Sequence, residues 1–100
     1  MPEVAASYGF KYEHVPASST NHVLGTTGAA GDYLHRLIIT VSTAATGTVT
    51  LLDNAASHVL TAANTPIGVY SVEVNTKSLN GAWRVTTGAG AEVLGIGNFT

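Results

Sequence analysis

Charged side chains are scarce in this sequence. Asp, Glu, Lys and Arg make up 10% of its 100 residues, and from Leu37 to Val72 the only charged residue is Asp53. Soluble domains usually carry about a quarter charged residues. Thr, Ser, Asn and Gly instead occupy the polar positions between Val, Ile and Leu. This composition is typical of a β protein whose faces are covered by neighbours.

Cysteine is absent, and basic residues are few. Without cysteine the chain has no disulfide framework, no thiolate metal site and no cysteine nucleophile. The four Lys and Arg residues are scattered and the formal net charge is -2, so no basic stripe is available for phosphates and we expect no nucleic-acid partner. No apolar run approaches the roughly 18 residues of a membrane helix, and the first residues do not resemble a signal peptide. We expect no membrane association.

Motifs for catalysis or cofactor binding are also missing. The segment Gly88–Val93 begins like a dinucleotide fingerprint, but Val93 replaces the third small residue and no helical pattern follows, which indicates a hairpin turn. The six carboxylates are dispersed, and the histidines occur singly without metal-ligand spacing. We therefore expect no metal, no cofactor and no enzymatic activity. The four histidines are His14, His22, His35 and His58.

From Asp32 onward, apolar and polar residues alternate with a period of two. In the segment 37–42, Leu37, Ile39 and Val41 share one face, as in a half-buried strand. Six or seven such strands, separated by turn signals about every 8 to 12 residues, predict an all-β antiparallel sandwich or small barrel. We assign residues 32–100 to this domain.

The inward face of the last two predicted strands contains unusual residues. Trp83 alternates with Val85 and is therefore predicted to lie in the core. Gly95 and Gly97 weaken the final strand unless a ring or another backbone packs against them, and Trp83 is the expected ring. On the polar faces, Glu73 and Arg84 are expected to pair across adjacent strands.

Residues 1–31 differ in composition and are predicted to form an extended arm followed by a glycine-rich hinge at Gly25, Gly28 and Gly31. Tyr8, Phe10 and Tyr12 alternate along this arm, so their side chains lie on one side of an extended segment. Two interpretations remain open. The three aromatics either form an edge that contacts a partner, or they close one end of the domain's own core.

Three segments resemble a family of small proteins encoded among the structural genes of tailed bacteriophages. They are Gly31–Ile39, beginning Gly-Asp-Tyr-Leu, the turn Ser42–Val49 with Thr-Ala-Ala-Thr, and Gly81–Gly90 with Gly-Ala-Trp. The resemblance covers approximately Thr26 to Phe99. It implies a virion component, resembling head decoration (cement) proteins, with a β-sandwich or jelly-roll-like fold.

This resemblance implies attachment to the major capsid protein on the capsid surface after synthesis in the host cytoplasm. Such a small domain also gains burial from symmetric copies, so we expect a homo-oligomer, a dimer or a trimer. For the partner contact the expected residues are Tyr8, Phe10 and Tyr12. The alternative is a carbohydrate- or receptor-binding module of a phage tail fibre or spike, with Tyr33, Tyr70 or Trp83 as the stacking platform. A tail-tube or connector subunit would need a longer inserted loop.

Overall fold

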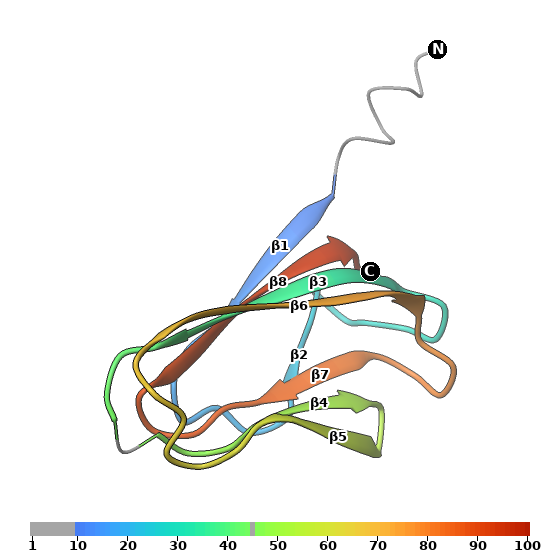
Figure 1. The fold of residues 1–100 in the computed structure, drawn as a ribbon. Helices are drawn as coiled ribbons and strands as arrows, with labels where there is room; N and C mark the ends of the chain where they lie inside the picture. Colours follow the sequence, from blue (N-terminus) through green and yellow to red (C-terminus); the bar gives the residue numbers. More distant parts are fainter. Residues whose placement is uncertain (1–9, 45) are drawn as a thin grey trace.

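The fold consists of two four-stranded antiparallel sheets packed face to face (Figure 1). The structure is a computed structural model that describes residues 10–44 and 46–100. Sheet A has the strand order β1-β8-β3-β6 and sheet B the order β2-β7-β4-β5. In this part of the chain no helix is long and apolar enough to cross a membrane. The strands are β1 (Lys11–Val15), β2 (His22–Val23), β3 (Tyr33–Val41), β4 (Val49–Asp53), β5 (Ala56–Thr61), β6 (Gly68–Lys77), β7 (Trp83–Thr86) and β8 (Ala91–Asn98).

The strand order is that of a jelly roll. Each strand of the first half pairs with its counterpart counted from the other end: β1 with β8, β2 with β7, β3 with β6 and β4 with β5. The pairings β3–β8 and β4–β7 then join these four strand pairs into two sheets. Consecutive strands therefore alternate between the sheets, except for β4 and β5, which both lie in sheet B. The predicted all-β, jelly-roll-like sandwich is confirmed.

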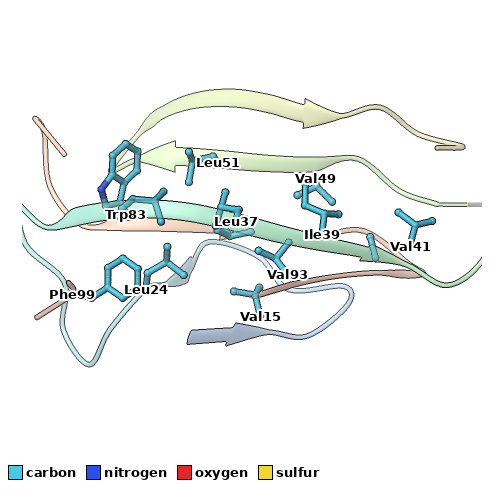
Figure 2. Packing of buried hydrophobic residues seen from close by; sticks show 13 residues of the cluster. Val15, Leu24, Leu37, Ile39, Val41, Val49, Leu51, Trp83, Val93 and Phe99 are labelled. Atoms are coloured by element: carbon cyan, nitrogen blue, oxygen red, sulfur yellow. The ribbon is translucent and has the colours of Figure 1, made fainter. Parts of the chain in front are cut away.

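The alternating sequence pattern positions the core between the sheets. Leu37, Ile39 and Val41 of β3 are at most 2% exposed, whereas Ile38 and Thr40 point to the other side of sheet A. Figure 2 shows these inward side chains meeting those of sheet B, such as Val49 and others of the same cluster. Burial of this apolar surface, at about 25 cal/mol per Å², is the main force that holds the two sheets together.

Trp83 belongs to this core, as its alternation with Val85 predicts. Its side chain is 5% exposed, and its indole Nε1–H donates a hydrogen bond of 2.9 Å to the backbone carbonyl of Asp32. The carboxylate of Asp32, itself buried, accepts backbone hydrogen bonds from Ala29 (3.0 Å) and Thr100 (3.1 Å). Asp32 thus joins the loop before β3, the core tryptophan and the end of the chain.

A second buried carboxylate fixes the turn between β6 and β7. Asp53, at the end of β4, accepts the backbone N–H of Leu79 (2.9 Å) on one oxygen and that of Asn80 (3.1 Å) on the other. The carboxylate group thus accepts hydrogen bonds from two backbone N–H groups of the turn, which would otherwise lack a partner. Asp53 is therefore structural, although it is the only charged residue in its part of the sequence.

The two glycines of β8 face the core, but Trp83 is not the side chain that covers them. Gly95 lies under the ends of Leu24 and Leu37, and Gly97 lies against Phe99 and the backbone of β3. The expected partner was wrong because the tryptophan is on sheet B beside Asp32, while the segment after β2 brings Leu24 over the middle of β8.

The division of the chain at residue 32 is not seen in the described residues. β1 forms an edge of sheet A, β2 forms an edge of sheet B, and Val15 and Leu24 are fully buried. The glycine-rich segment is a packed turn rather than a hinge, since the backbone N–H groups of Thr27 and Gly28 both donate to the carbonyl of Thr100 at 2.9 Å. Within the described residues the sandwich begins at Lys11.

Candidate functional site

The candidate site is the outer face of sheet A, the face turned away from sheet B. The strand registers define it in rows that run across the sheet. Tyr12 of β1, Ile96 of β8 and Arg36 of β3 form one row, and His14, Leu94 and Ile38 form the next. A third row contains Glu92, Thr40 and Val69. No pocket is found in residues 10–44 and 46–100.

Apolar side chains occupy the middle of this outer face. Leu94, Ile96 and Ile38 are half-buried by their neighbours on the sheet alone, and Tyr12 is 73% exposed. The outer face of a sandwich sheet normally carries polar residues that alternate with the core residues. Sheet A therefore presents apolar surface on both of its faces.

An aromatic cluster lies at one end of the outer face. The ring of Phe10 stacks on His35 with centroids 5.0 Å apart and lies tilted against Tyr33 at 5.7 Å. Phe10 immediately precedes the pair Lys11–Gly97, so its side chain reaches Tyr33 across Asn98 of β8. His35 is available for this contact because β3 has a bulge between Leu34 and Arg36. The cluster thus ties the start of β1 to β3.

Hydrogen-bonded polar pairs lie beside the apolar residues. His14 Nε2 is 2.9 Å from Glu92 Oε1, and Arg36 Nη2 donates to Glu73 Oε2 at 3.0 Å. The expected partner of Glu73 was wrong. Arg84 is on β7 in sheet B, whereas the register of β3 and β6 sets Arg36 directly opposite Glu73.

The remaining histidines do not form a metal cluster in the described part of the chain. His22 of β2 points between the sheets and lies 2.8 Å from Glu13 Oε2 of β1, which links the two edge strands. His58 of β5 is exposed. Each histidine thus has a separate environment.

Two of the three predicted contact residues lie on the outer face of sheet A. Phe10 is 40% exposed and Tyr12 is 73% exposed, and neither belongs to the core cluster. The interpretation that they close the core is therefore wrong for these two residues. Tyr8 lies outside the described residues.

The three aromatics suggested for carbohydrate stacking are dispersed. Trp83 is buried, and Tyr70 faces inward with its hydroxyl donating to the carbonyl of Pro66 at 2.7 Å. Only Tyr33 lies on the outer face of sheet A, where its hydroxyl donates to Asn75 Oδ1 at 3.1 Å. The three rings therefore do not form one platform.

Leu94, Ile96 and Ile38 were not identified from the sequence as surface residues. A signal for them exists in the unbroken apolar run Leu37-Ile38-Ile39, because consecutive apolar residues in a strand indicate that both faces are covered.

Comparison of the chain with models of protein families, with curated proteins and with solved structures found no significant match. The fold and the outer face of sheet A are therefore the basis for inferring function.

Proposed function

We propose that this chain is a capsid decoration protein of a tailed bacteriophage, which attaches to the outer head lattice through the outer face of sheet A. The observation that carries the proposal is the apolar surface on both faces of one sheet. A second apolar face in a sandwich has no role in the domain's own core, and contiguous apolar surface of this kind marks an interaction site. The partner that we propose, the major capsid protein, is the one implied by the resemblance to phage structural proteins.

The composition of this face suits a permanent, non-covalent contact. Leu94, Ile96 and Tyr12 supply apolar area, and a charge buried without a partner at such a contact would be costly. The carboxylates beside them already have partners, His14 for Glu92 and Arg36 for Glu73. Binding that buries this face would bridge capsid subunits and stabilise the assembled lattice by mass action, with no chemical step.

Sedimentation with empty capsids of the phage that encodes the chain tests the proposal. We expect saturable co-sedimentation, and a loss of affinity of about tenfold or more when Phe10 and Tyr12 are both changed to Ser. The matched control changes Val59 and Leu79 to Ser, because these side chains are 65% and 82% exposed but lie off the outer face of sheet A. Equal affinity of the two double variants, or no co-sedimentation of the unmodified chain, would overturn the proposal.

The aromatic cluster favours carbohydrate binding as a second candidate function. The rings of Phe10 and Tyr33 lie 5.7 Å apart, and the Tyr33 hydroxyl is bound to the amide of Asn75. Aromatic rings with nearby polar groups are suited to sugars. A glycan array distinguishes the two candidates. Binding that is lost on Phe10→Ser, together with absence from sedimented capsids, would favour the receptor-binding module.

A further inference from the structure

The free edge of β6 is the other unpartnered feature of sheet A. β6 is an outermost strand, and in the described part of the chain it pairs only with β3. Edge strands are normally protected by proline, bulges or inward charges. From Gly68 to Glu73 this strand has none of these, and its register with β3 shifts only beyond Glu73. The only charged residue of this stretch is Glu73, which is bound to Arg36.

The core is incompletely covered along this edge. Tyr70, Val72 and Val74 face inward and pack against the core cluster, yet all three remain half-exposed. On the opposite edge strand of the same sheet, the inward Val15 is fully buried. The inward apolar side chains are therefore more exposed on the side of the sandwich formed by β5 and β6 than at Val15 on the opposite side.

We propose that a second copy of the chain pairs with this edge, with β6 antiparallel to β6 of the other copy about a two-fold axis at Val72. The two copies of sheet A then form one continuous eight-stranded sheet. The inference goes beyond the proposed capsid attachment and does not depend on it.

The sequence of β6 is complementary to itself in this register. Val72 faces its own copy, and Tyr70 faces Val74 of the other copy, so the inward side chains form one apolar row. On the outer side Ser71 lies opposite Glu73 of the other copy. Arg36 occupies Oε2 of Glu73, and Oε1 can accept the Ser71 hydroxyl. Opposed polar and apolar pairs of this kind stabilise a sheet by about 0.2–1 kcal/mol each.

Neighbouring registers are less favourable. An axis at Glu73 would set two carboxylates directly opposite each other, and like charges in that position are destabilising. An axis at Ser71 would place Glu73 opposite the apolar Val69. The positive φ of Asn75, 50°, marks the irregularity at which β6 departs from its register with β3. The register about Val72 pairs residues 70–74, so it reaches this irregularity only at Val74 and leaves Asn75 outside.

Cysteine cross-linking tests both the partner and the register, because the chain has no cysteine of its own. We expect Val72→Cys to form a disulfide-linked dimer on mild oxidation. Val69→Cys is the matched control on the same strand. Its side chain is 67% exposed, but the two copies would lie about 20 Å apart in this register, beyond the ~7 Å limit between disulfide-linked Cα atoms.

Equal cross-linking of Val72→Cys and Val69→Cys would indicate random collision and overturn the proposal. A light-scattering series over protein concentration provides the second test and does not alter the core. Ser71→Glu should weaken the dimer about 2- to 30-fold by opposing two carboxylate pairs, whereas Ser71→Lys should strengthen it. A monomer at every concentration, or identical behaviour of the two Ser71 variants, would also overturn the pairing.

Discussion

Gly97 is a position at which an added methyl group is expected to destabilise the fold strongly. It faces the core from β8, opposite Leu34 at the bulge of β3. A Cβ at this position would lie 2.9 Å from Phe99 Cε1 and 3.0 Å from Leu34 Cα, and closer still to the carbonyl oxygen of Tyr33. Two of these neighbours are backbone, so β3 and β8 would have to separate. We expect Gly97→Ala to lower the free energy of unfolding by about 3 kcal/mol or more.

Gly95 provides the matched control two residues earlier on the same face. Its added methyl would lie 3.3–3.4 Å from the terminal carbons of Leu24 and Leu37, and flexible side-chain ends can move by a few tenths of an ångström. The loss of freedom in the unfolded chain stabilises Gly-to-Ala variants by about 0.4–1 kcal/mol. We therefore expect Gly95→Ala to change the stability by about 1 kcal/mol or less.

Urea denaturation followed by fluorescence measures this difference, because Trp83 is the only tryptophan and lies in the core. A loss of 3 kcal/mol also corresponds to a fall in Tm of about 12–24 °C for a domain of this size. If the two variants unfold at the same urea concentration, the close approach of β3 to Gly97 is not a constraint and the reasoning fails.

Two further substitutions test the buried polar contacts. Asp53→Asn leaves one amide oxygen for two backbone donors and sets an NH2 group against the other, so we expect a loss of about 1.5–3 kcal/mol in urea denaturation; an unchanged midpoint would contradict the role given to the carboxylate. Trp83→Phe removes the donor to the carbonyl of Asp32 and leaves space in the core, so we expect a loss of about 1–3 kcal/mol by calorimetry, and a Tm equal to that of the unmodified chain would argue against it.

The regular strands of the sandwich could be predicted from the sequence because a period of two specifies which side chains face the core. The alternation at Leu37, Ile39 and Val41, and that at Trp83 and Val85, is observed in the structure. The place of residues 11–24 could not be predicted in this way. β1 and β2 are short, and their pairing with β8 and β7 depends on strands distant in the sequence, which no local pattern reveals.

The candidate site was partly predictable. The aromatic alternation at Phe10 and Tyr12 indicated a surface that the structure places on sheet A. The apolar residues Leu94 and Ile96 belong to the same surface only because β8 lies between β1 and β3. Recognising that surface requires the order of strands in the sheet, which the spacing of residues along the chain does not contain.

The position of the last two strands has a consequence for the time at which this protein folds during synthesis. β8 lies between β1 and β3, and β7 lies between β2 and β4. Neither sheet has both of its inner strands until β7 and β8 have left the ribosome. A nascent chain that ends before β7 exposes the unpaired edges of β1 to β4, so folding waits for β7 and β8 and proceeds at the millisecond-to-second rates typical of long-range β topologies.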